Sequence, residues 1–168
     1  MPATTRPRTR IAAVEVPPAA DDAFLEGRRG GALPRALRAD VALRFVEFDG
    51  LARAGAGFPA HAGVYEIVEE AGEPAGAGGV LLISFLAVGA GEDERLVAAR
   101  EEIREAWSGC RGQLGMRLYR DAGDADFRFV EVTRWSSPLM YARALREPAV
   151  AAPLAGPFAS RAALYLPV

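Results

Sequence analysis

The sequence predicts an α+β fold in which two similar halves, each an antiparallel sheet with helices, close into one barrel. Two observations lead to this prediction. Residues 70–79 are rich in Gly, Ala and Glu without apolar periodicity, which is typical of a linker and divides the chain into residues 1–69 and 80–168. Each part also contains four segments with strand character. An open sheet of four strands would leave one face bare, so we expect a barrel of about eight strands.

Three short sequences of the first part recur in the second part in the same order. One such match arises easily in a chain rich in Ala and Arg, but three ordered matches indicate an internal duplication. The matching segments are residues 35–38 with 117–120, 44–47 with 128–131, and 58–65 with 158–165.

Residues 80–168 predict a complete unit with the order strand, helix, strand, strand, helix, strand. Apolar side chains at helical spacing predict that the first helix carries Leu96, Ala99, Ile103, Ala106 and Trp107 on its inner face. Ser137 followed by Pro138 is typical of a helix start, and Pro148 ends that helix. The predicted strands are residues 80–87, 116–120, 127–135 and 162–168, and the predicted helices are residues 94–107 and 139–146.

Residues 1–69 predict a reduced version of the same unit. From Arg44 to Tyr65 there are 21 positions, whereas from the matching Arg128 to Tyr165 there are 37. The first part is therefore 16 residues shorter at this place, and we expect it to lack the second helix. Its predicted strands are residues 10–16, 33–38, 41–48 and 63–68, and its one short helix is predicted at residues 20–28.

The composition excludes several classes of function. A net charge of −2 gives no positive field for nucleic acid or an anionic membrane surface, so neither is expected as a partner. All 20 basic residues are Arg, Cys110 is the one cysteine and His61 the one histidine. Lysine Schiff-base chemistry, an intramolecular disulfide and a His- or Cys-rich metal site are therefore excluded. With no apolar run long enough for a signal or a membrane span, we expect a cytoplasmic protein with an inert, reduced Cys110.

The stretch FRFVEVTRWSSPLMYARAL, residues 127–145, resembles the antibiotic biosynthesis monooxygenase family, together with GMRLYRD before it and ALYLPV near the end of the chain. The resemblance covers residues 80–168 well and the first part in outline. It implies ferredoxin-like units paired as a dimeric α+β barrel, here as tandem repeats on one chain, and leaves open a homodimer of such chains. It also implies a cofactor-independent oxygenase that uses dioxygen to convert phenolic polyketide anthrones into quinones in antibiotic or pigment biosynthesis.

The resemblance assigns roles to individual residues. Trp135 and Tyr141 match a Trp at the end of the third strand and a Tyr six positions later in the following helix. Four residues before that Trp the family carries an Asn, where this chain carries Glu131. Packing at the start of the helix is the alternative role for Trp135 and Tyr141.

Strand alternation gives Glu131 a physical role of its own. One face of the predicted strand carries Phe127, Phe129, Glu131, Thr133 and Trp135. If helices cover this face, burial raises the pKa of Glu131 toward the range useful for general acid–base catalysis. The alternative is a carboxylate paired with one of the arginines. Glu47 repeats the arrangement in the first part, and there pairing is favoured.

We expect the main ligand cavity between this strand and the helices that begin at Glu94 and Pro138. The catalytic residues would be Glu131, Trp135 and Tyr141. Phe127, Phe129, Arg117 and Arg134 would bind the substrate, the arginines by stabilising negative charge. A solvated loop position is favoured over catalysis for His61.

Three functions remain open at this point. The first is the oxygenase, with an aromatic polyketide and dioxygen as substrates and no cofactor. The second is a polyketide cyclase or isomerase, in which the same carboxylate removes a proton and no oxygen is consumed. The third is a non-catalytic barrel that binds a ligand.

Overall fold

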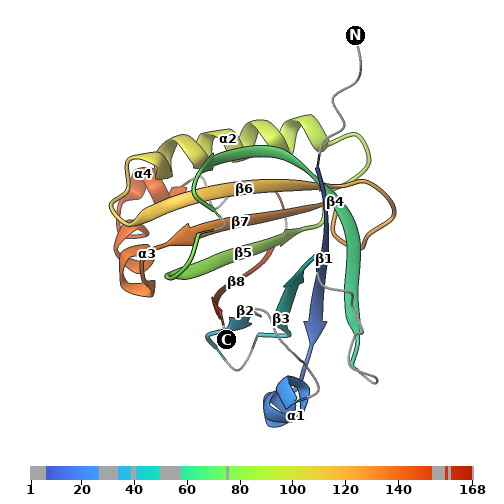
Figure 1. Ribbon diagram of the computed structural model, residues 1–168. Helices are drawn as coiled ribbons and strands as arrows, with labels where there is room; N and C mark the ends of the chain where they lie inside the picture. The colour runs from blue at the N-terminus through green and yellow to red at the C-terminus, as the bar shows by residue number, and fades with distance from the viewer. Residues whose placement is uncertain are drawn as a thin grey trace.

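The computed structural model describes residues 7–26, 34–38, 41–49, 58–74, 76–152, 158 and 160–167, which form one closed barrel of antiparallel strands (Figure 1). The predicted α+β class and the barrel within one chain are therefore confirmed. The strands of the first half are β1 (Arg8–Glu15), β2 (Pro34–Ala36), β3 (Leu43–Phe48) and β4 (Ala60–Gly72). Those of the second half are β5 (Val80–Leu86), β6 (Gln113–Asp121), β7 (Phe129–Trp135) and β8 (Ser160–Pro167).

The two halves have the same strand order. Around the barrel the strands run β1-β3-β2-β8-β5-β7-β6-β4, and β4 closes the ring onto β1. Within each half the fourth strand thus lies beside the first, followed by the third and the second, which is the ferredoxin-like order. The halves join where β4 pairs with β6 and where β2 pairs with β8. The last residues of β4 pair with β6, so β4 extends into residues 70–79, which had been predicted as linker.

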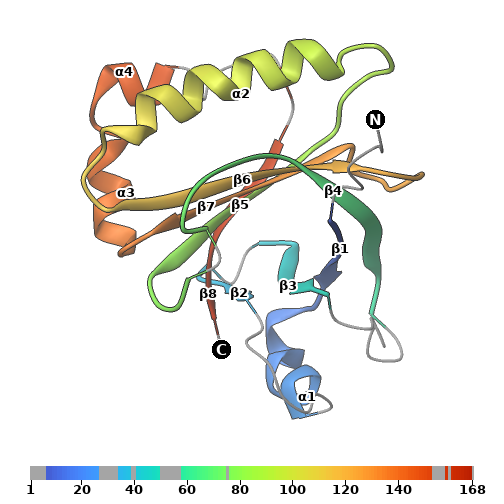
Figure 2. The same cartoon turned by 45° about the horizontal axis from the view of Figure 1, so that its top comes forward.

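The helices are distributed unequally between the halves. The second half has α2 (Asp93–Ser108), α3 (Pro138–Ala144) and α4 (Pro148–Ala151), and α2 lies across the outer face of its sheet (Figure 2). The first half has the 3-10 turn η1 (Pro18–Ala20) and the short α1 (Asp21–Glu26). Residues 50–57, where the missing helix was expected, lie outside the described residues. No helix in the described part of the chain is long and apolar enough to cross a membrane.

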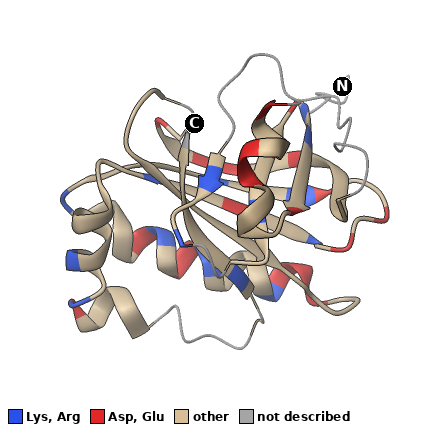
Figure 3. Ribbon diagram, turned by 90° about the horizontal axis from the view of Figure 1, so that it is seen from below, with Lys and Arg blue, Asp and Glu red and all other residues tan. Residues whose placement is uncertain are grey.

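The sequence explains how these helices begin and which side they bury. Ser137 caps α3 because its hydroxyl accepts a hydrogen bond from the backbone N–H of Met140 at 3.3 Å, as predicted. The helix predicted to end at Pro148 ends earlier, at Ala144, and Pro148 instead starts α4, a helix that was not predicted. On α2 the predicted residues Leu96, Ile103 and Trp107 are buried, and acidic and basic residues are both present along the helix (Figure 3).

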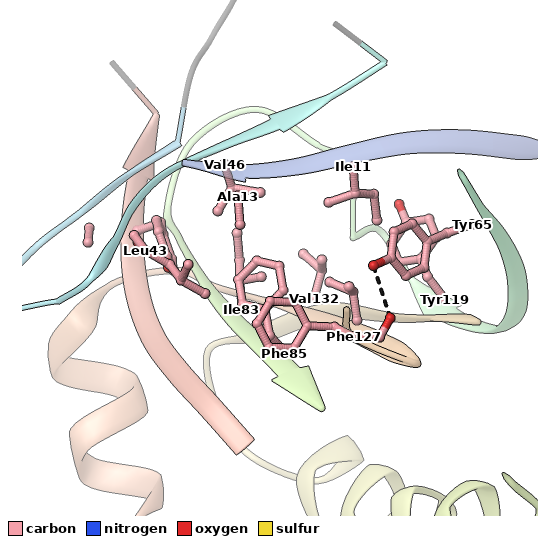
Figure 4. Close-up of a cluster of buried hydrophobic side chains, with 13 residues drawn as sticks. Ile11, Ala13, Leu43, Val46, Tyr65, Ile83, Phe85, Tyr119, Phe127 and Val132 are labelled. Atoms are coloured by element: carbon pink, nitrogen blue, oxygen red, sulfur yellow. Dashed lines mark hydrogen bonds between the residues drawn. The ribbon is translucent and has the colours of Figure 1, made fainter. Parts of the chain in front are cut away.

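The interior of the barrel is an apolar core to which both halves contribute (Figure 4). Two buried tyrosines cross between the halves. The Tyr65 hydroxyl of β4 donates to the carbonyl of Phe127 at 3.0 Å, and the Tyr165 hydroxyl of β8 donates to the carbonyl of Leu43 at 2.7 Å. The tyrosines are matching positions in the repeated sequences, and their acceptors directly precede the matching segments 44–47 and 128–131, so the two bonds are reciprocal. This reciprocity supports the predicted duplication.

A second pair of equivalent contacts holds the first helix of each half. The guanidinium of Arg44 binds Asp21, the first residue of α1, with 2.7 Å between Nη2 and Oδ2. The matching Arg128 binds Asp93, the first residue of α2, also at 2.7 Å between Nη2 and Oδ2. The Arg44 pair is buried, whereas the side chain of Arg128 is 39% exposed. Arg44 also donates to the carbonyls of Ala36 and Arg38.

The difference in burial predicts different costs of losing each acid. The Asp21→Asn variant leaves a buried guanidinium without its charge partner, which should lower the free energy of unfolding by about 3 kcal/mol or more. Asp93→Asn is the matched control and should cost at most about 1 kcal/mol, because water screens its partner. Urea denaturation of both variants measures the difference. Equal losses would contradict a structural role for the buried pair.

Candidate functional site

The outer face of β7 carries the predicted site residues under α2. Phe129, Glu131 and Trp135 are buried there, because alternate residues of β7 turn away from the barrel interior toward the helices. Phe127 was placed on the same face, and this was wrong. It precedes the first residue of β7 and packs in the barrel interior, 5.1 Å from the ring centroid of Phe85.

Glu131 is the buried acid at the centre of this face. Its exposed fraction is 1%, and its Oε1 lies 3.6 Å from Nη1 of Arg100 on α2. Burial raises the pKa of Glu131; the Arg100 charge opposes the shift, and the Glu69 charge adds to it. Arginine pairing and a raised pKa were predicted as alternatives for Glu131, but both occur in the structure. Arg100 itself was missed, although its spacing from Leu96 and Ile103 puts it on the buried side of α2.

An aromatic cluster adjoins this acid. The ring centroid of Trp135 lies 5.5 Å from that of Tyr141 on α3 and 5.6 Å from that of Trp107 on α2, both in edge-to-face geometry. Burial raises the pKa of the Tyr141 hydroxyl, and the charge of Glu131 raises it further. The hydroxyl and the carboxylate therefore share one environment. The structure brings together the three residues that were predicted as catalytic, and we call them, with Trp107 and Arg100, the helix-covered cluster.

Several polar atoms of this region are buried without a hydrogen-bond partner among the described residues. They belong to neighbouring side chains of β7 and α2, and native proteins satisfy almost all such atoms. The buried atoms of this region include both acceptors and donors, so they can bind an oxygen-bearing ligand or water. These atoms are both carboxylate oxygens of Glu131, Oγ1 of Thr133, Nε of Arg100, and Nε1 of Trp107 and of Trp135.

The two arginines predicted to bind substrate lie on the opposite face of the sheet. Arg117 of β6 and Arg134 of β7 face the interior end of the barrel, and Arg100 takes the place beside Glu131 that was expected for them. Arg117 lines a cavity of about 300 Å³ at that end, which residues of both halves enclose. This cavity is not the one predicted between α2 and β7, where the buried rings of Trp107 and Trp135 pack against each other.

His61 and Cys110 lie outside the helix-covered cluster. His61 is not a loop residue as predicted but lies in β4, with Nδ1 2.6 Å from Asp126 Oδ2 and Nε2 3.2 Å from Glu15 Oε1. The hydrogen bond with Asp126 raises the pKa of His61, burial partly offsets this, and Glu15 raises it further. Burial raises the pKa of the Cys110 thiol, in keeping with an inert cysteine.

The raised pKa of His61 predicts a pH dependence of stability. The folded chain binds the His61 proton more tightly than the unfolded chain, so the added stability is full below about pH 6.5 and is lost as the pH rises through the folded pKa. The free energy of unfolding should therefore fall over this range. Urea denaturation at several pH values measures the slope, and His61→Gln should flatten it. An unchanged slope in the variant would assign the effect to other groups.

The fold and the buried carboxylate define the class of this protein: a ferredoxin-like α+β barrel with a candidate site under the helices of its second half. Solved structures of similar fold include an uncharacterized ferredoxin-fold protein related to antibiotic biosynthesis monooxygenases from Listeria monocytogenes. Its TM-score is 0.57 and its identity 11%, over 96% of this chain and 94% of that chain.

Two further solved structures show how widely this fold is used. An anthrone oxidase-like protein has a TM-score of 0.61 and 12% identity, over 97% of this chain and 92% of that chain. A major regulator of staphylococcal pathogenesis has a TM-score of 0.62 and 11% identity, over 96% of this chain and 100% of that chain. At these identities the likeness shows the fold alone. No protein-family model matches the sequence, and no curated protein sequence matches it.

Proposed function

We propose that this chain is a cofactor-independent monooxygenase that oxidises an anthrone-type phenol of aromatic polyketide origin to a quinone. The observation that carries the proposal is the buried carboxyl of Glu131, whose pKa is raised by burial and which shares its environment with the Tyr141 hydroxyl. Its fold, which is also that of an anthrone oxidase-like protein, adds support.

The reaction needs a base, an electron-rich anion and exclusion of water. Glu131 would remove a proton from the methylene carbon of the anthrone, and the resulting anion would transfer one electron to dioxygen. Recombination forms a carbon–oxygen bond and a peroxide. Loss of the second methylene hydrogen with cleavage of the O–O bond then gives the quinone carbonyl and one water molecule, so that both atoms of dioxygen are accounted for.

The cluster offers groups for each of these needs. Arg100 would stabilise the anion of the substrate, because its guanidinium lies next to the base and has an unpartnered Nε. The Tyr141 hydroxyl would donate to a substrate oxygen, and Trp135 would pack against the rings. Since Tyr141 is only half-buried and sits on the seven-residue helix α3, movement of α3 would admit the substrate.

Oxygen consumption tests the proposal. The purified chain, treated with a chelator to remove adventitious metal, should consume one dioxygen for each anthrone converted, with quinone formed at the same rate. An oxygen electrode and absorbance spectroscopy measure the two quantities together. Anthrones also oxidise slowly without protein, so heat-denatured chain is the control. A rate equal to that control would overturn the proposal.

A polyketide cyclase or isomerase is the second candidate. It is favoured by the acid itself, because a buried carboxyl with a raised pKa can remove a proton next to a carbonyl without any oxygen chemistry. Such an enzyme would convert its substrate equally fast without dioxygen. The non-catalytic barrel is favoured by the two tryptophans that fill the space under α2. It predicts no turnover with or without dioxygen.

A further inference from the structure

The cavity at the end of the barrel is separate from the helix-covered cluster, since it opens on the opposite face of the sheet. Its volume is about 300 Å³, at the small end of the range for small-molecule pockets. One wall is aromatic, with the ring centroids of Phe48 on β3 and Tyr119 on β6 6.3 Å apart. Leu81 and Val132 continue this apolar wall. The space suits one or two aromatic rings rather than a large polycycle.

One arginine lines this cavity, and a second packs against a residue of its wall. Arg117 lines it, and its Nη1 donates to the Tyr119 hydroxyl at 3.1 Å. Arg134 lies on the same face of the neighbouring strand, two positions along from the residue paired with Arg117. Its guanidinium packs so closely on Gly76, which lines the cavity, that a methyl group there would overlap it.

The existing partners of these arginines are weak competitors for a ligand. Arg117 pairs with Glu70, and Nη2 of Arg134 lies 3.5 Å from Oε2 of Glu73. The Glu70 side chain is 43% exposed and that of Glu73 84%, so water screens both charges. Arg134 is buried, and its Nε and Nη1 have no hydrogen-bond partner among the described residues.

The lining of the cavity also includes an acidic side chain. Asp49 lines it, and its Oδ1 accepts a hydrogen bond from the backbone N–H of Arg10 at 3.2 Å. The backbone of Asp49 is left-handed, with φ of 55°, a conformation uncommon for residues other than glycine. Its carboxylate would repel an anion but accept a hydrogen bond from a hydroxyl group. The cavity therefore has a basic and an acidic side chain in its lining, together with an aromatic wall.

We infer that this cavity binds a small hydroxylated aryl carboxylate. Its carboxylate binds Arg117, close to the charge of Arg134 behind Gly76; its one or two rings lie against Phe48 and Tyr119, and a hydroxyl away from the carboxylate donates to Asp49. The inference does not depend on the proposed function, because it concerns different residues on the other face of the sheet.

Calorimetric titration of the full chain tests this site, with a hydroxynaphthoate whose hydroxyl is remote from the carboxylate as probe. We expect saturable binding of one molecule per chain. The corresponding hydroxynaphthamide, which lacks the charge, should bind with an affinity at least about tenfold lower. The Arg117→Gln variant should bind the hydroxynaphthoate with a similarly reduced affinity. The Arg8→Gln variant is the matched control, because Arg8 pairs with Glu66 on the exposed surface of the barrel. The affinity of this variant for the hydroxynaphthoate should be unchanged.

The two tryptophans locate the bound probe. Both Trp107 and Trp135 lie in the helix-covered cluster, so their indole N–H resonances should stay in place while ring protons of Phe48 and Tyr119 shift. Shifts of the indoles without shifts of Phe48 and Tyr119 would overturn the inference. So would equal affinity for the amide, an unchanged affinity of Arg117→Gln, or the absence of saturable binding. Turnover of an anthrone is measured separately and can fail or succeed whatever this titration shows.

Discussion

The Glu131→Gln variant is expected to bind an anthrone but to convert it about 10²- to 10⁴-fold more slowly than the unchanged chain. Glutamine keeps the shape of the side chain but cannot take up a proton. Because burial raises the pKa of Glu131, the rate of the unchanged chain should increase with pH above the usual range of a carboxyl group, as the base ionises. This increase should be absent in the variant. Initial rates of quinone formation over a range of pH measure both effects.

Arg100 makes a stability control necessary. With Glu131 neutral, the buried guanidinium loses the charge that lies 3.6 Å away, and the free energy of unfolding should fall by about 3–5 kcal/mol. The double variant Arg100→Gln/Glu131→Gln removes both charges and should regain part of this stability without regaining turnover. Glu47→Gln, at the matching position of the first half, should keep the full rate. A Glu131→Gln variant with an unchanged rate would exclude this residue as the base.

The second large effect is expected when the halves are separated. Residues 80–168 expressed alone should not form a folded monomer. Removal of the first half leaves β6 without β4 and β8 without β2, and exposes the interior side chains that the first half covers. It also breaks both crossing hydrogen bonds, because it removes Tyr65 and the Leu43 carbonyl that accepts from Tyr165. Sedimentation analysis should show an aggregate or a self-dimer, in which a second copy supplies the missing sheet.

Co-expression of residues 1–79 with residues 80–168 is the control for this experiment. The two fragments should form a one-to-one complex, because the missing strands are then present on a separate chain. Tyr65→Phe in the first fragment should weaken that complex, since the hydroxyl can no longer donate to Phe127. A stable, monomeric fragment of residues 80–168 would contradict the dependence of each half on the other.

The fold could be predicted because short sequences are repeated at equivalent structural positions. The arginines of the two matching segments, Arg44 and Arg128, bind the first residue of a helix in each half, and the matching tyrosines cross the barrel in both directions. The ends of the elements were less predictable. β4 extends beyond its apolar residues because β6 offers backbone partners there, and that pairing depends on the closure of the barrel.

The grouping of Glu131, Trp135 and Tyr141 was predictable, since it depends on strand alternation and one helix start. Their catalytic roles remain predictions. Phe127 was misplaced because alternation holds only inside a strand, and β7 begins two residues later. Arg117 and Arg134 were assigned by charge alone, although their positions relative to Leu118 and Trp135 put them on the other face. The cavity inside the barrel is formed by residues from six strands and from the segments that follow β3 and β4, which no local pattern brings together.

The closed ring of strands has a consequence for how copies of this chain can associate. Among the described residues every strand has a hydrogen-bonded neighbour on both sides, so these strands offer no edge on which another chain could add a strand. The native chain should therefore resist fibril growth by strand addition. A homodimer would have to be held by side-chain contacts. Leu139 on α3 is available for such contacts, because it is 73% exposed.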